Sequence, residues 1–212
     1  MQDWICDTMI VAKKHYTLPE SYRILVEGLL SMRFLSRARS QGDLNQEFIE
    51  RIMLAVTEVN GCAACSYAHT KMALESGMSA SEVQAMLAGI IDDVPANEVA
   101  AILFAQHYAD TKGNPSREAW ERTVELYGQR TAQGILVAIR AIMIGNVYGI
   151  PFSALIGRIK GRPDPQSSFG REIAMLLAFV PALPVALLHA LVATLARVPV
   201  ISFSEHSATA AH

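Results

Sequence analysis

The chain has 212 residues and a formal net charge of −2 at pH 7, with 51% apolar and only 18% charged residues. An ordinary soluble domain carries about 25% charged residues, whereas disordered chains combine low hydrophobicity with high charge. The composition therefore excludes intrinsic disorder, and the lack of a basic excess argues against binding to nucleic acid. The length suits one domain, or one domain with an appendage.

The cysteines indicate the cellular compartment. Cys6, Cys62 and Cys65 are an odd set with one close pair, which is not the framework of a disulfide-rich secreted domain. Asp3 and Asp7 interrupt the first ten residues, so no signal peptide is recognised there. We therefore expect a cytoplasmic protein, in which a C-x-x-C pair is redox-active or binds a metal.

Helical signals run through the first 150 residues, and strand signals are nearly absent. Asp43 is a candidate N-cap, Gly77 is placed to end a helix, and Ser79 begins an S-x-x-E capping box. The predicted helices are 19–34, 43–59, 62–76, 79–91, 93–111, 115–128 and 131–148. Because the connections are short, we predict an all-α bundle of antiparallel helices.

The composition changes after Gly149, and we divide the chain into a helical domain, 1–156, and an extension, 157–212. A basic, turn-rich linker is followed by residues 173–196, which contain no Asp, Glu, Lys or Arg. That segment is long enough to cross a bilayer. Two interpretations stay open: contact with a membrane, or an apolar helix pair packed on the domain or on a second subunit. Pro181 and Pro184 favour a break into two short helices.

The chemistry is carried by Cys62, Cys65 and His69, which are spaced to share one face of a helix. We expect Cys62 in the first turn, where free N–H groups and the helix dipole favour a thiolate. One thiolate can attack a peroxide O–O bond to form a sulfenic acid, and the second thiol can condense with it to a disulfide. The imidazole can move the protons, and an external thiol must reopen the disulfide.

These residues also resemble a known family. The pattern Glu50-x11-Cys62-x2-Cys65-x3-His69, preceded by Asn60-Gly61 and followed by LESGMSASEV at 74–83, is similar to the alkylhydroperoxidase D (AhpD) branch of the carboxymuconolactone decarboxylase family. The resemblance covers about residues 20–150. It implies an all-α fold with an apolar C-terminal extension outside it, and a homo-oligomer such as a trimer or hexamer.

The resemblance also implies a function and a role for each residue. It implies reduction of a hydroperoxide, with electrons from a thiol reductant protein or a dihydrolipoyl-type donor and without a bound cofactor or metal. Cys65 would attack the peroxide, and its proton would leave through His69 toward Glu50. Cys62 would be the resolving thiol, more accessible than Cys65 and exchanging with the reductant. The helix-dipole argument instead favours Cys62 as the thiol of lower pKa.

Several alternatives stay open. Some peroxidases of the family carry a His where this chain has Ala64, which would weaken or abolish peroxidase turnover and leave a redox sensor or a disulfide-exchange protein. Glu58, four residues before Cys62, competes with Glu50 as the acid. A zinc site, an inert buried thiol pair and lactone decarboxylation on the same scaffold are the remaining interpretations.

Overall fold

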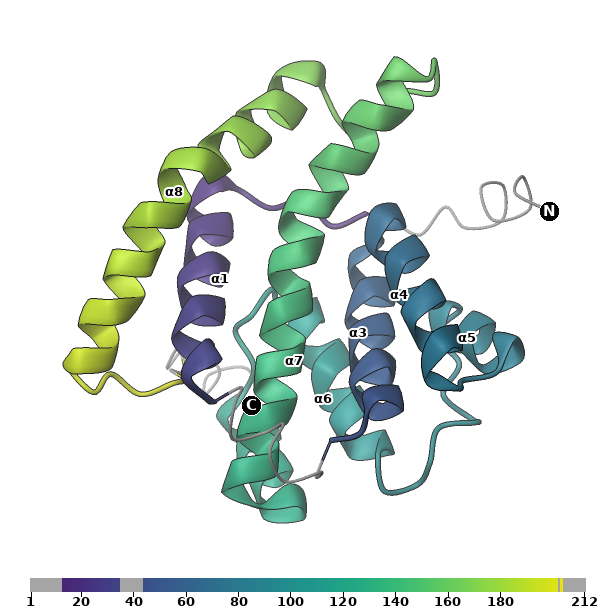
Figure 1. The fold of residues 1–212 in the computed structure, drawn as a ribbon, viewed down its shortest axis with the longest axis vertical. Helices are drawn as coiled ribbons and strands as arrows, with labels where there is room; N and C mark the ends of the chain where they lie inside the picture. The colour runs from purple at the N-terminus through teal and green to yellow at the C-terminus, as the bar shows by residue number, and fades with distance from the viewer. Residues whose placement is uncertain (1–12, 35–43, 202, 204–212) are drawn as a thin grey trace, which may run out of the picture.

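The computed structural model describes residues 13–34, 44–201 and 203. Within these residues the protein is built from α-helices with one short 3-10 helix and contains no strand, which confirms the all-α prediction (Figure 1). The elements are α1 (Leu18–Ser31), η1 (Met32–Phe34), α3 (Gln46–Asn60), α4 (Ala63–Ser76), α5 (Ala80–Leu87), α6 (Val99–Asp110), α7 (Arg117–Ile159) and α8 (Phe169–Leu195).

Local capping residues explain most helix boundaries. The side chain of Asn45 caps α3, and that of Ser79 caps α5 by accepting the N–H of Glu82. The predicted cap Asp43 lies outside the described residues. Gly61 ends α3 with φ 69°, a left-handed conformation that glycine adopts without steric cost, and Gly77 ends α4 in the same region.

The long helix α7 lies at the centre of the molecule and packs against α1, α3, α4, α6 and α8 (Figure 1). Ile135, Ile139 and Met143 of α7 are completely buried, and they share the main core with Ile52 and Leu54 of α3. The site described below is formed where α3 and α4 meet this central helix.

The predicted helix break near Gly128 is confirmed. Within α7 (Arg117–Ile159), Gly128 has φ 74° and ψ 156°, which are not helical, so α7 consists of two helices that meet at a kink at this residue. The second of them continues past the predicted end at Tyr148, through Pro151, to Ile159. The expected boundary between residues 156 and 157 therefore falls inside α7.

The apolar segment of the C-terminal extension lies in one helix, α8, so the predicted break at Pro181 and Pro184 is wrong. Both prolines lie inside α8, on its exposed side. Each proline removes only its own N–H, and a helix can absorb that loss by bending; α8 follows a curved path along α1 (Figure 1). The inner face of α8 packs on α1 through Ala186 and Ala190.

A buried guanidinium joins three helices next to the site. Arg51 of α3 donates to Glu82 of α5 at 2.6 Å, to Glu98 beside α6 at 3.1 Å and to Glu47 one turn away at 3.3 Å. The Glu82 carboxylate therefore binds Arg51 and does not form the return hydrogen bond of a capping box with the backbone of Ser79. This network fixes α3, which carries one of the candidate catalytic residues.

Candidate redox site

The two cysteines lie at the start of α4, directly after the left-handed Gly61. Cys62 is the N-cap of the helix rather than part of its first turn, and its Sγ accepts the N–H of Cys65 at 3.3 Å. Both are free thiols. Cys62 is completely buried, whereas Cys65 is 8% exposed.

Small residues of α7 form the wall behind the thiols. A Cβ placed on Gly149 would lie 2.7 Å from the Sγ of Cys62 and 3.0 Å from the Sγ of Cys65, so both sulfurs pack on one point of this helix. A Cβ on Gly145 would lie 3.9 Å from the Sγ of Cys65, an ordinary contact. Only glycine at position 149 leaves room for the sulfur pair as it stands.

Ser153, one turn beyond Gly149, fastens α7 to the start of α4. Its hydroxyl accepts the N–H of Ala64 at 3.1 Å and donates to the carbonyl of Gly149 at 2.7 Å. Ala64 is the position where some peroxidases of the resembled family carry a histidine. In this chain the backbone of that residue, rather than a side chain, contributes to the site.

The surroundings of the pair polarise the two thiols in opposite directions. The S–H of Cys65 donates to the sulfur of Cys62, and this contact, helped by the N–H groups of Cys65 and Ala64, lowers the pKa of Cys62 against the opposing effect of burial. The same contact, together with burial, raises the pKa of Cys65. Cys62 is therefore the more acidic thiol of the pair, as the helix-dipole argument predicts.

The predicted acid, Glu50, and the predicted imidazole, His69, contact each other one turn of α4 beyond Cys65. Nδ1 of His69 lies 2.8 Å from Oε2 of Glu50, which is completely buried on α3. The other carboxylate oxygen accepts from Gln46 at 2.7 Å. Because a carboxylate accepts, the imidazole donates from Nδ1 and keeps Nε2 for proton exchange. His69 follows Cys65 by four residues on α4 and shares its helix face.

The competing acid Glu58 is placed elsewhere. Its carboxylate lies next to Gly89, where a Cβ would be 3.5 Å from Oε1, and burial raises its pKa against the influence of Lys14. The structure thus selects Glu50 as the carboxylate that bonds to His69. Among the described residues no group of three or more His, Cys, Asp or Glu is arranged to hold a metal ion.

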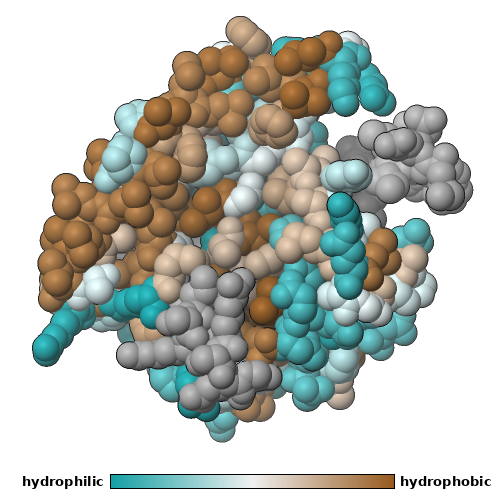
Figure 2. Space-filling view, in the orientation of Figure 1, coloured by the Kyte–Doolittle hydropathy of each residue, from teal (hydrophilic) through white to brown (hydrophobic). Residues whose placement is uncertain are grey.

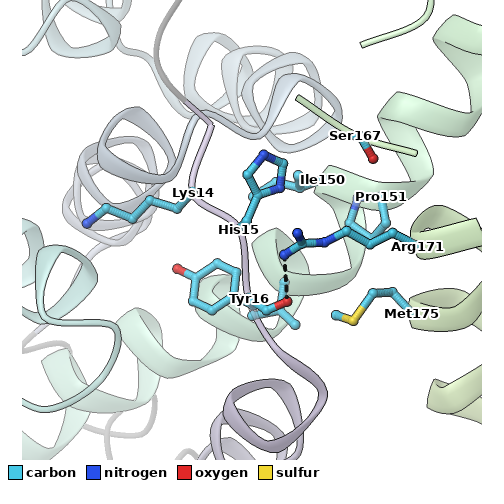
Figure 3. A pocket seen from close by; sticks show the side chains of 9 residues that line it. Lys14, His15, Tyr16, Ile150, Pro151, Ser167, Arg171 and Met175 are labelled. Atoms are coloured by element: carbon cyan, nitrogen blue, oxygen red, sulfur yellow. Dashed lines mark hydrogen bonds between the residues drawn. The ribbon is translucent and has the colours of Figure 1, made fainter. Parts of the chain in front are cut away.

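The segment before α1 covers the other side of the thiol turn. The hydroxyl of Tyr16 donates to the side chain of Asn60 at 2.7 Å, and burial raises the pKa of this phenol. Figure 3 shows a narrow cleft beside Tyr16, where the Arg171 guanidinium donates to the Tyr16 carbonyl at 3.3 Å. Ile150 and Pro151, which follow Gly149 on α7, line this cleft, but neither cysteine does.

The structure thus brings Glu50 to His69 and both cysteines to one wall of α7. One expectation is contradicted: Cys62 is the less accessible thiol, because its position as N-cap presses it against Gly149. The sequence analysis missed Gly149 and Ser153. The sequence feature that could have revealed them is the spacing of Gly145, Gly149 and Ser153, which places small residues on three successive turns of an apolar stretch.

The fold and this site define an all-α protein with a buried thiol pair beside a carboxylate–imidazole pair. Residues 25–107 match the model of the carboxymuconolactone decarboxylase family, which includes the AhpD-like proteins. The match contains all four candidate site residues but ends before α7. No curated protein and no solved structure matches the chain.

Proposed function

We propose that this protein is a thiol-dependent peroxidase that reduces a hydroperoxide through Cys62 and Cys65. The observation that carries the proposal is the coexistence of two features on α4. The first is a free thiol pair in which contacts lower the pKa of one sulfur, and the second is an imidazole oriented by a buried carboxylate one turn away. Thiolate character and a positioned proton carrier are what peroxide reduction by cysteine requires.

We assign the attack to Cys65, as the family resemblance does. Cys65 is the less deeply buried residue of the pair and shares a helix face with His69. When Cys65 passes its proton to the sulfur of Cys62, the charge moves to Cys65, which is then the nucleophile. The Cys65 thiolate takes the terminal oxygen of the hydroperoxide, and the O–O bond breaks to leave an alkoxide.

The remaining steps return the protons and close the disulfide. A protonated His69 gives the alkoxide a proton and so releases the alcohol. The Cys62 thiol then condenses with the sulfenic acid on Cys65, forming the disulfide and water. Overall, two thiols and one hydroperoxide become a disulfide, an alcohol and a water. A dithiol reductant reopens the disulfide by exchange at Cys65, since Cys62 is buried.

Peroxide consumption with a dithiol reductant tests the proposal. Wild-type protein should turn over, and Cys65→Ser and Cys62→Ser should not. A sulfenic-acid trap should label Cys62→Ser, which keeps the attacking sulfur, and leave Cys65→Ser unlabelled. The opposite labelling would reverse the order of the two sulfurs. A single oxidation without turnover would instead indicate a redox sensor, and activity on a lactone substrate without either cysteine would indicate a decarboxylase.

We also propose a homo-oligomer, as the family resemblance implies. Helix α4 buries only Cys65 and Ala73 and exposes Tyr67 and Leu74, which lie two turns apart on one helix face. Such a face is suited to contact with a second copy of the chain. Light scattering of the purified protein would measure the number of subunits, and a monomer at all concentrations would contradict this proposal.

A further inference from the structure

The outer face of α8 has an unusual composition for a helix at the surface of a protein. Most of its large apolar side chains are more than half exposed; they are Phe169, Leu177, Val180, Val185, Leu187, Leu188, Leu191, Val192 and Leu195. Figure 2 shows the resulting apolar surface along the whole length of the helix. Monomeric soluble proteins rarely expose an apolar patch of this extent without a partner.

The C-terminal half of the inner face of the same helix carries small residues, and the large apolar residues Met175, Phe179 and Leu183 pack on the protein nearer its start. Ala186, Ala190 and Ala193 are buried against α1, where they meet Leu25 and Leu30. An ordinary surface helix does the reverse and turns its large apolar residues toward the core. Small residues between helices with large apolar residues outside are the arrangement of helices that face lipid.

The charges near α8 also fit a lipid surface. The exposed residues Lys160, Arg162 and Arg171 precede or open the helix, and Arg197 follows it. The acidic residue of the first turn, Glu172, is buried and bound by Arg158 at 2.8 Å, so it presents no charge outward. Basic residues at the ends of an apolar helix match the anionic headgroups of a membrane surface.

The geometry points to a lipid surface as the partner of α8, with the helix lying in the plane of the membrane and its leucine–valine face in the bilayer. In the part of the chain that the structure describes, α7 and α8 are long and apolar enough to cross a membrane, but 67% of the apolar window of α7 is buried inside the protein, against 17% for α8. Helix α8 lies on the surface rather than spanning, because its inner face stays packed on α1.

Flotation of the full chain with lipid vesicles tests this proposal without using enzymatic activity. The wild type should float with vesicles of phosphatidylcholine and phosphatidylglycerol. Leu188→Asn with Leu191→Asn should bind at least about tenfold more weakly, because both exposed side chains leave the bilayer. Leu103→Asn with Leu126→Asn is the matched control, since these leucines are 51% and 57% exposed on α6 and α7, and it should bind as the wild type does.

A second pair of variants tests the contribution of charge. Lys160→Gln with Arg162→Gln should weaken binding to the anionic vesicles about tenfold and leave binding to phosphatidylcholine alone unchanged. Absence of flotation by the wild type, or equal flotation of the two leucine double variants, would overturn the proposal. If the Leu188/Leu191 variant instead splits a soluble oligomer that never binds vesicles, the face of α8 contacts a second copy of the chain.

Discussion

Replacing Gly149 by alanine should damage the thiol pair specifically, because this residue is the point of α7 on which both sulfurs rest. The added methyl would lie 2.7 Å from the Sγ of Cys62 and 3.0 Å from the Sγ of Cys65, whereas ordinary contacts begin near 3.4 Å. Neither the backbone of α7 nor the N-cap Cys62 can move away freely. We therefore expect the sulfurs to be displaced and peroxide reduction to be lost or strongly slowed.

The size of the stability change follows from two opposing effects. Overpacking of a core typically costs about 1–3 kcal/mol, while glycine to alanine inside a helix contributes about 1 kcal/mol of stability. Gly145→Ala is the matched control on the same face of α7, since its methyl would meet Cys65 at 3.9 Å and Ile142 at 3.7 Å. Gly145→Ala gains the same helix stability without the clash. The free energies of unfolding of the two variants should therefore differ by about 1–3 kcal/mol.

Urea unfolding of the reduced proteins measures this difference, and the rate of disulfide formation with peroxide measures the effect on the site. In a background with Cys62→Ala and Cys65→Ala the sulfurs are gone, and Gly149→Ala should then be as stable as Gly145→Ala. Equal stability and equal oxidation rates for the two glycine variants in the native background would refute the reasoning.

The remaining predictions concern charge and proton transfer. Glu50→Gln should lower peroxide turnover about a hundredfold, because the neutral amide no longer stabilises a protonated His69; the pH–rate profile is the measurement, and an unchanged profile would exclude a relay. Cys65→Ala should raise the pKa of Cys62, because it removes the donor that contributes most to lowering it; the midpoint of thiolate absorbance should move to higher pH. Arg51→Met should destabilise the fold by about 3–5 kcal/mol, because it leaves buried carboxylates unpaired, and the loss should shrink in acid as they are protonated.

The sequence predicted the start of the site well because its signals are local. The start of α4 next to Asn60-Gly61 and its end at Gly77 follow from backbone conformations that glycine adopts readily. The spacing of Cys65 and His69 needs only one helix. The pairing of Glu50 with His69, by contrast, joins two helices, and it was the family resemblance rather than spacing that preferred Glu50 over Glu58.

The sequence failed where packing between distant segments decides the outcome. The prediction ended a helix at Tyr148, before Gly149 and Pro151, yet α7 continues through both residues to Ile159 because this part of the helix packs on the core. Pro181 and Pro184 are also breaking signals, yet their rings lie on the exposed side of α8 and the inner face holds the helix together. Local propensity is a weak predictor when tertiary contacts oppose it.

The position of Gly149 explains why the family match alone does not define the site. The match ends at residue 107, so it includes the cysteines and the carboxylate–imidazole pair but not the wall of α7 that the sulfurs touch. Ser153 on that wall also holds the N–H of Ala64, one of the groups that lower the pKa of Cys62. The reactivity of the pair therefore depends on how closely α7 packs against α4, and substitutions on α7 should change thiol chemistry even where every residue of the matched motif is kept.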